Sequence, residues 1–293
     1  MKADFAAALA AALGRPVAPE PDATVHGGSI NDCLRWPTAS GPVFVKRAPL
    51  ARRWILEAEV DGLARLRATR CLRVPATLAA GCTERDAFLV LEWLDLAPGD
   101  AGSDERLGLA LARLHALRGE AFGLDLDNAL GATRQPNGWT HDWIAFWRER
   151  RLGFQLQLAA HNGYAGRLLD RGRRLLEQLA GFFAGHDPEP ALLHGDLWGG
   201  NRAMLADATP VLFDPAVYVG DGECDLAMTR LFGGFGPRFY AAYESVRPAA
   251  AGASARRDLY NLYHVLNHLN LFGGVYRPQA ESMIDRLLAA VGH

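Results

Sequence analysis

The chain has 293 residues, of which 49% are hydrophobic and 22% are charged, ordinary values for a globular protein with a substantial core. This length suggests one large domain or two modest ones. A formal net charge of −2 excludes a basic field that recruits nucleic acid, and the apolar runs are too short to cross a bilayer.

The alanine-rich segment from Met1 to Gly14 predicts a short helix. It lacks the cationic start and the cleavable apolar core of a signal peptide, so we expect a cytoplasmic protein. The chain has four cysteines and no C-x-x-C pair. A zinc site or a disulfide framework is therefore an unfavourable interpretation.

The first 93 residues predict five strands and one helix. In residues 50–68, Leu56, Val60, Leu63 and Leu66 recur at helical spacing. Short β-branched and aromatic runs around this helix, separated by Gly and Pro, indicate strands. The expected strands lie at residues 24–36 (two short strands), 42–46, 75–81 and 87–93.

Residues 95–103 contain Pro98, Gly99 and Gly102, which break both periodicities and indicate a linker. The helices expected beyond it lie at residues 104–117, 141–160, 165–185, 224–231, 237–246, 256–271 and 279–291. We therefore predict an α+β protein with two lobes. A small antiparallel five-stranded lobe (1–94) is joined through the linker (95–103) to a larger, mainly helical lobe (104–293), and ligands favour such an inter-lobe cleft.

The strongest chemical signal is the run H-G-D-L-W-G-G-N at residues 194–201, followed by a strand that ends in Asp214. Phosphoryl transfer requires a carboxylate that orients or deprotonates the attacking hydroxyl, and oxygen ligands for Mg²⁺. Asp196 can act as the base, while Asn201 and Asp214 can hold the metal. The alternative is a polar turn, but this spacing before a strand ending in Asp is much rarer than a single turn.

Lys2 and Lys46 are the two lysines among 31 basic residues, so the chain uses arginine wherever any cation suffices. A lone internal lysine on a strand suggests a compact point charge, which can bind nucleotide phosphates when a glutamate holds it. Glu57 and Glu59 are both candidates, and we prefer Glu59 because it lies on the inward side of its helix. The alternative is that neighbouring arginines neutralise both glutamates on a solvated face.

The turn between the first two strands is a candidate phosphate-binding loop, formed by Gly27, Gly28, Ser29, Ile30 and Asn31. Its backbone can approach phosphates and donate hydrogen bonds, although Gly-Gly-Ser is also ordinary hairpin chemistry. No Walker A motif occurs in the chain. Backbone groups of Glu92 and Leu94 could pair with an adenine edge, but a buried strand that meets a linker predicts the same sequence.

Together these motifs resemble the fructosamine kinase (ketosamine-3-kinase) family, within the protein-kinase-like and aminoglycoside phosphotransferase group. The resemblance covers nearly the whole chain and includes D-P-A-V-Y-V-G-D-G-E-C-D-L-A-M at 214–228 and L-F-G-G at 271–274. It implies a bilobal kinase fold. It also implies ATP- and Mg²⁺-dependent phosphorylation of the 3-hydroxyl of a sugar attached to an amine, a reaction of deglycation.

The resemblance also implies residue roles. Asp196 is similar to the family's base, Asn201 and Asp214 to its Mg²⁺ ligands, and Lys46 with Glu59 to its phosphate-anchoring pair. The residues that we expect to contact the sugar-amine are Trp198, Glu223, Asp225, His264 and His268. The expected partners are a free or protein-linked ketosamine and, at most, a second copy of the chain.

Family members often carry a cysteine in the nucleotide loop, and Cys33 lies there. We hypothesise redox sensitivity, with an intersubunit disulfide as one form of it; the alternative is an inert small residue. Two other functions stay open. One is a related kinase of aminoglycosides, choline or simple sugars. The other is a regulatory pseudokinase, against which the intact Lys46, Asp196, Asn201 and Asp214 argue.

Overall fold

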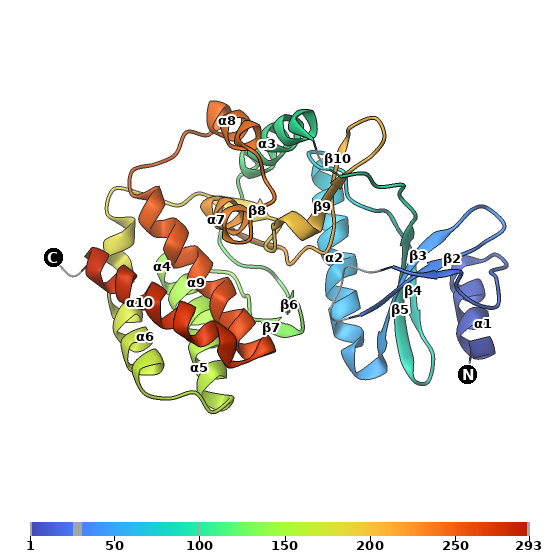
Figure 1. Ribbon diagram of the computed structural model, residues 1–293, viewed down its shortest axis with the longest axis horizontal. Coiled ribbons are helices and arrows are strands. Elements are labelled where there is room, and N and C mark those ends of the chain that lie inside the picture. The colour runs from blue at the N-terminus through green and yellow to red at the C-terminus, as the bar shows by residue number, and fades with distance from the viewer. Residues whose placement is uncertain (1, 26–30, 99, 292–293) are drawn as a thin grey trace.

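A computed structural model describes residues 2–25, 31–98 and 100–291. The chain forms a small lobe built on a β-sheet and a larger helical lobe, which lie side by side in Figure 1. The five-stranded sheet has the order β1-β2-β3-β5-β4, and all neighbouring strands are antiparallel. Its strands are β1 (Ala23–Thr24), β2 (Asp32–Trp36), β3 (Val43–Pro49), β4 (Thr77–Cys82) and β5 (Asp86–Glu92).

Two helices cover opposite faces of this sheet, α1 (Lys2–Leu13) and α2 (Arg53–Thr69). Side chains alternate between the faces along each strand. On β3, Val43 and Val45 pack in the α1 cluster, whereas Phe44 and Ala48 belong to the α2 cluster. Lys46 therefore points to the α2 face, which looks toward the helical lobe.

Helix α2 begins three residues later than expected, because residues 50–52 form a 3₁₀ turn, η1 (Leu50–Arg52). Its buried residues include Leu56, Glu59, Leu63 and Leu66, at helical spacing. Glu59 therefore lies on the buried stripe of α2. Glu57 lies on the exposed side, where its carboxylate pairs with Arg53.

The larger lobe contains α3 (Ala101–His115), which begins inside the segment expected to be a linker, with Asp100 as its capping residue. Its other long helices are α7 (Glu223–Leu231), α8 (Pro237–Val246), α9 (Ala253–Phe272) and α10 (Arg277–Val291). The remaining helical segments are α4 (Trp143–Phe146), η2 (Trp147–Gly153), α5 (Phe154–His161), α6 (Arg167–Glu177), η3 (Leu179–Phe183), η4 (Gly199–Asn201) and η5 (Gly274–Tyr276).

Two predicted helices are less regular than their sequence periodicity suggests. The expected helix 141–160 contains a π-helical turn, η2, where a Cβ on Gly153 would lie 2.3 Å from the carbonyl oxygen of Arg148. The expected helix 165–185 stops at Glu177 and continues as a 3₁₀ turn. In the part of the chain that the structure describes, no helix is both long and apolar enough to cross a membrane.

Three small two-stranded ribbons connect the helices of the larger lobe, and they carry the segments that face the sheet lobe. They pair β8 with β11, β9 with β10 and β6 with β7. Their strands are β6 (Asn128–Leu130), β7 (Thr133–Gln135), β8 (Pro190–Leu193), β9 (Arg202–Met204), β10 (Pro210–Leu212) and β11 (Tyr218–Asp221).

Candidate active site

Lys46 crosses from the sheet to a pair of carboxylates. Its Nζ lies 2.7 and 2.8 Å from the two carboxylate oxygens of Glu59, and it also contacts Asp214 from the larger lobe. The Lys46 side chain is only 6% exposed. Burial alone would lower the pKa of Lys46, but Asp214 and Glu59 raise it above its ordinary value. The ammonium is therefore charged and held in a fixed place between the lobes.

The loop that follows β8, residues 194–201, carries Asp196 and Asn201. Gly195 has φ +82°, and a Cβ there would lie 2.0 Å from the carbonyl oxygen of Ala216, so only glycine allows this close approach. The side-chain amide nitrogen of Asn201, Nδ2, donates to the backbone oxygen of Asp196 at 2.9 Å and to its Oδ2 at 3.1 Å. The side-chain carbonyl oxygen of Asn201 then lies on the other side of the amide group, and Asn201 lines the cleft, where that oxygen can meet a ligand.

Asp214 follows β10 and adopts a left-handed backbone conformation with φ +56°. Non-glycine residues in this conformation are uncommon and often mark functional sites. The backbone is held on both sides, because the Phe213 amide donates to Asn201 at 3.1 Å and the Ala216 amide donates to His194 at 2.8 Å. The carboxylate is 40% exposed, so it meets both Lys46 and open space.

Burial raises the pKa of two carboxyl groups in the cleft, Glu59 and Asp196. Burial, with a further contribution from the charge of Asp214, raises the pKa of Asp196 to about 7, although the hydrogen bond from Asn201 lowers it. A carboxyl group with a pKa near neutral is suited to accept a proton and to release it again.

Three connected cavities follow the cleft between the lobes. A cavity of about 480 Å³ lies against the sheet, one of about 160 Å³ lies in the middle, and one of about 300 Å³ lies in the helical lobe. Lys46 and Asp214 line the first two cavities, while Asp196 and Trp198 line the middle and the third. Asp196 thus lies at the junction between the middle cavity and the helical-lobe cavity.

The sheet-side cavity is lined by Glu92 and Leu94, the two residues expected beside an adenine. The carboxylate of Glu92 accepts a hydrogen bond from Arg73 at 2.7 Å, and its backbone amide donates to the carbonyl of Ala76 at 3.0 Å. Asn31 lines the middle cavity beside Lys46. The rest of the expected phosphate loop, Gly27, Gly28, Ser29 and Ile30, lies outside the described residues.

The helical-lobe cavity has an aromatic and imidazole lining. Trp198, His264 and His268 line it, together with Phe232 and Phe272. The His268 ring lies 5.0 Å from the Phe232 ring and 5.4 Å from the Phe272 ring, centroid to centroid. Burial lowers the pKa of His264 to about 3, so its imidazole is neutral near pH 7. The structure therefore brings three of the five expected substrate residues to one cavity beside Asp196.

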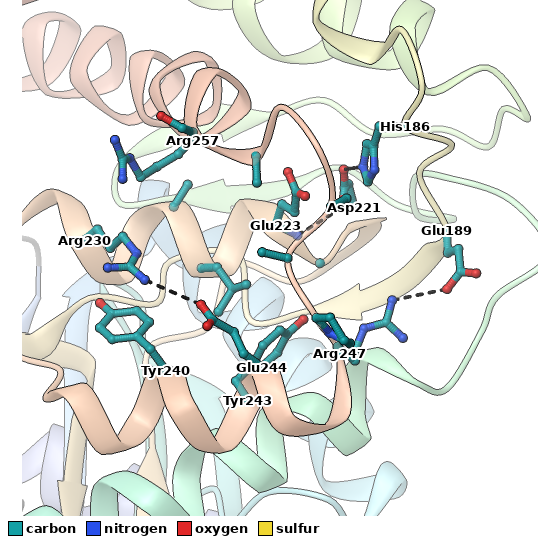
Figure 2. Close-up of a pocket in the computed structure, with 18 of the residues that line it drawn as sticks. His186, Glu189, Asp221, Glu223, Arg230, Tyr240, Tyr243, Glu244, Arg247 and Arg257 are labelled. Carbon is teal, nitrogen blue, oxygen red and sulfur yellow. Dashed lines mark hydrogen bonds and ion pairs between the residues drawn. The ribbon is translucent and has the colours of Figure 1, made fainter.

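The other two expected substrate residues, Asp225 and Glu223, line none of the three cleft cavities. Asp225 is 1% exposed and lies beneath the 194–201 loop, where it accepts hydrogen bonds from the amides of His194 at 2.8 Å and Gly195 at 2.9 Å. The carboxylate of Glu223 is bound by Arg256 at 2.7 and 2.8 Å and faces a separate cavity (Figure 2). Both carboxylates are engaged in structural contacts rather than facing the cleft.

Cys33 lies on β2 opposite Lys46 and is 9% exposed. Burial raises the pKa of its thiol to about 11, so the reactive thiolate is scarce at neutral pH. A thiol with this exposure is also poorly placed to bridge two copies of the chain. The geometry therefore favours the inert interpretation of Cys33 over the redox one.

Several residues that line or support the cleft could not be anticipated from local sequence patterns. Gly131 lines both the middle and the helical-lobe cavities from the turn between β6 and β7, a ribbon that no periodicity predicted. His115, at the end of α3, contacts Asp225 at 3.2 Å and Tyr243 at 2.9 Å, so it supports the 194–201 loop from below. Only the tertiary structure shows these contacts, because the partners are far apart in sequence.

Comparison with known proteins places this arrangement in a family. The fructosamine kinase family model matches residues 1–290. A "probable ketoamine kinase" of Synechocystis is 44% identical over 276 residues, which cover 94% of this chain and 92% of that protein. The chloroplastic protein-ribulosamine 3-kinase of Arabidopsis thaliana is 41% identical over 268 residues, covering 90% of this chain and 82% of its own length.

The fold agrees with these similarities. The crystal structure of a "putative fructosamine-3-kinase" from Haemophilus somnus superposes with a TM-score of 0.87 at 30% identity, covering 97% of each chain. Solved antibiotic phosphotransferases that are less similar in sequence share the fold, with TM-scores of 0.61 and 0.65. The bilobal, protein-kinase-like α+β fold is confirmed, and this chain belongs to the fructosamine kinase family.

Proposed function

We propose that this chain is an ATP-dependent kinase that phosphorylates the 3-hydroxyl of ketosamines, such as fructosamine or ribulosamine adducts. The observation that carries the proposal is the position of Asp196 between the middle cavity, lined by Lys46 and Asp214, and the aromatic cavity of the helical lobe. A donor nucleotide on the sheet side and an acceptor on the helical side would meet at Asp196. The two expected lobes, residues 1–94 and 104–293, would supply the two sides of this cleft, with α3 beginning inside the expected linker 95–103.

On the nucleotide side, the backbone carbonyl of Glu92 and the backbone of Leu94 would meet the adenine in the sheet-side cavity. Lys46, which Glu59 holds in place at 2.7 Å, would bind the phosphates. The family implies Mg²⁺, and the oxygen-donor set of the Asp214 carboxylate and the Asn201 carbonyl fits this ion. Bound there, Mg²⁺ supplies positive charge that offsets the negative charge of the triphosphate.

On the acceptor side, Asp196 would take the proton of the attacking hydroxyl. As that oxygen bonds to the γ-phosphorus, the bond from phosphorus to the bridging oxygen of ATP breaks, and ADP leaves. Asn201 holds the Asp196 carboxylate at 3.1 Å, which keeps it aimed at the acceptor. Asp225 positions the same loop from beneath through two backbone amides.

The aromatic cavity supports a sugar-amine acceptor. Trp198 and Phe232 give flat apolar surfaces on which a sugar ring can stack. The neutral imidazole of His264 can donate a hydrogen bond to a sugar hydroxyl or accept one from it. The similar Arabidopsis protein is named for ribulosamine carried on protein, which is why we place this chain's acceptor in the ketosamine class.

The test is a panel of acceptors with ATP and Mg²⁺, analysed by mass spectrometry for a phosphate added to each. We expect phosphorylation of fructosamine or ribulosamine adducts, with ADP formed in equal amount. Phosphorylation of kanamycin, choline or a free sugar in their place would favour the related small-molecule kinases. Nucleotide binding with no acceptor phosphorylated, and no difference between wild type and Asp196→Asn, would favour a pseudokinase.

A further inference from the structure

A separate cavity of about 550 Å³ is lined by residues of α7, α9 and α10 and by Tyr240 of α8. It shares no lining residue with the three cleft cavities. Three arginines line it, Arg230 from α7, Arg257 from α9 and Arg286 from α10. Asp258 is the one acidic residue among the residues described in its lining, so the cavity carries an excess of positive charge.

These arginines have weak or neutral partners. Arg230 lies 4.0 Å from Glu244, and Arg257 lies 3.6 Å from its neighbour Asp258. Arg286 donates to the hydroxyl of Ser282 at 2.8 Å, which leaves its charge uncompensated by that contact. Exposed ion pairs at such distances contribute little, so an anion can compete for these guanidinium groups.

The neighbouring cavity of about 480 Å³ shows how the charges are separated. It shares Arg230, Tyr240 and Arg257 with the arginine-lined cavity. In Figure 2, Arg230 and Arg257 lie at one end of it, while Glu189 and His186 lie at the other. Arg230 and Arg257 therefore lie where the two cavities meet, with Glu244 beside Arg230 as the nearest acidic group of this second cavity.

Asn261 supplies a second, independent observation. Its side chain is on α9, one helical turn after Arg257, and it lines the same cavity while being only 5% exposed. Its carbonyl oxygen is buried and has no hydrogen-bond partner among the residues described. A buried unpaired polar group is costly, so this amide calls for a ligand. By turning about its last torsion it can offer either N–H donors or the oxygen.

We propose that this cavity binds a phosphate group, either as free phosphate or as the phosphate of a small phosphomonoester. Guanidinium groups match phosphate oxygens with paired hydrogen bonds, and three helices each contribute an arginine to this lining. The Asn261 amide would bind a phosphate oxygen or a hydroxyl of the ester. The volume is in the range of small-molecule sites.

The cavity also has a physical route to the acceptor site. Leu231 and Gly233 form part of its wall, while Phe232 between them lines the helical-lobe cavity, the proposed acceptor site. Next along the chain, Gly234 packs so closely on the 194–201 loop that an added Cβ would lie 2.7 Å from the Cα of Gly199. Phosphate bound by Arg230 would therefore fix the position of residues 231–234, which shape the helical-lobe cavity. A bound phosphate should then lower the KM for the acceptor.

The binding test uses the full chain with the nucleotide site saturated by magnesium and a non-hydrolysable ATP analogue, at constant ionic strength. Isothermal calorimetry with inorganic phosphate and, separately, with ribose 5-phosphate distinguishes the two sources. We expect one site, weakened about tenfold in Arg257→Gln and in Arg286→Gln, and unchanged in the control Arg174→Gln on α6. Asn261→Asp, which adds a negative charge, should abolish binding, and thermal melts confirm that each variant is folded.

Two results overturn the proposal. One is no phosphate or ester binding at tens of millimolar with the nucleotide site filled; the other is binding that the cavity variants leave unchanged. The coupling is tested by the acceptor KM with and without phosphate, in wild type and in Arg286→Gln. We expect phosphate to lower KM in wild type only, and an unchanged wild-type KM overturns the coupling. Because calorimetry requires no turnover, its outcome is independent of whether the proposed kinase activity is correct.

Discussion

The half-buried Asp196 in the cleft and the fully buried Asp225 beneath the 194–201 loop differ in the donors that surround them. In the cleft, Asn201 is the side-chain donor to Asp196, whose pKa burial and Asp214 raise to about 7. Asp225, beneath the 194–201 loop, is fully buried, and burial alone would raise its pKa. Hydrogen bonds from His115 and from backbone amides lower it instead.

This contrast teaches that burial by itself does not separate a reactive carboxylate from a structural one. The decisive quantity is the number of hydrogen-bond donors that stabilise the charged form. Asp225 has its oxygens saturated and holds the loop in place, whereas Asp196 has room for a substrate. The same reasoning explains Glu223, whose carboxylate Arg256 holds through two hydrogen bonds.

The largest expected effect comes from removing the reactive carboxylate. Asp196→Asn keeps the shape and the place of Asp196 but removes the proton acceptor. We expect kcat to fall about 10²- to 10⁴-fold, measured as ADP release with a ketosamine acceptor. The melting temperature should change little, since this carboxylate contributes no strong structural pair. Retention of more than a tenth of wild-type kcat would contradict the assignment of Asp196 as base.

The second prediction uses the pKa of about 7 for Asp196. The base works only when deprotonated, so kcat/KM for magnesium ATP should be level above pH 7 and fall below it. At pH 5 the rate should be about one hundredfold below its high-pH plateau, with a slope that approaches a factor of ten per unit of pH. A rate that stays level from pH 8 to pH 5 would show that Asp196 does not titrate in this range.

The third prediction concerns Asp225, the aspartate beneath the 194–201 loop. The pKa of Asp225 is lowered in the folded state, so its charged form stabilises the fold at neutral pH, and that stability is lost as the pH falls through its folded pKa. Asp225→Asn mimics the protonated form and should cost about 2–3 kcal/mol of unfolding free energy, measured by urea denaturation. Asp170→Asn, with a side chain 70% exposed on α6, serves as the control and should change stability by less than about 0.5 kcal/mol.

Asp225→Asn also sharpens the comparison between the two aspartates. Since Asp225 acts by positioning the loop, its substitution should lower stability and rate together, whereas Asp196→Asn should lower the rate alone. A variant of Asp225 with full stability but no activity would mean that Asp225 itself meets the substrate.

The smallest effect is expected at Cys33. Its thiol is buried and its pKa is raised to about 11, so peroxide should find little thiolate to oxidise. We expect Cys33→Ala to change kcat and the sensitivity to peroxide by less than about twofold. Peroxide inhibition of the wild type that disappears in Cys33→Ala would instead restore the redox hypothesis.

Much of this cleft could be anticipated from local patterns. The two-residue period of a strand separates Lys46 from Val45, and helical spacing places Glu59 beside Leu56 and Leu63. The spacing from Asp196 to Asn201 lies within one loop, so the sequence constrains their separation directly. These residues converge in the structure, while the roles given to them stay predictions for the experiments above.

Tertiary structure alone decided which carboxylates face the cleft. Asp225 meets His115 across 110 positions of sequence, and Glu223 meets Arg256 across 33, so no local pattern could reveal that either group is already bound. The arginine-lined cavity likewise draws single residues from three separate helices. Local periodicity fixes the face on which a side chain lies, but the partners on that face depend on how distant elements pack.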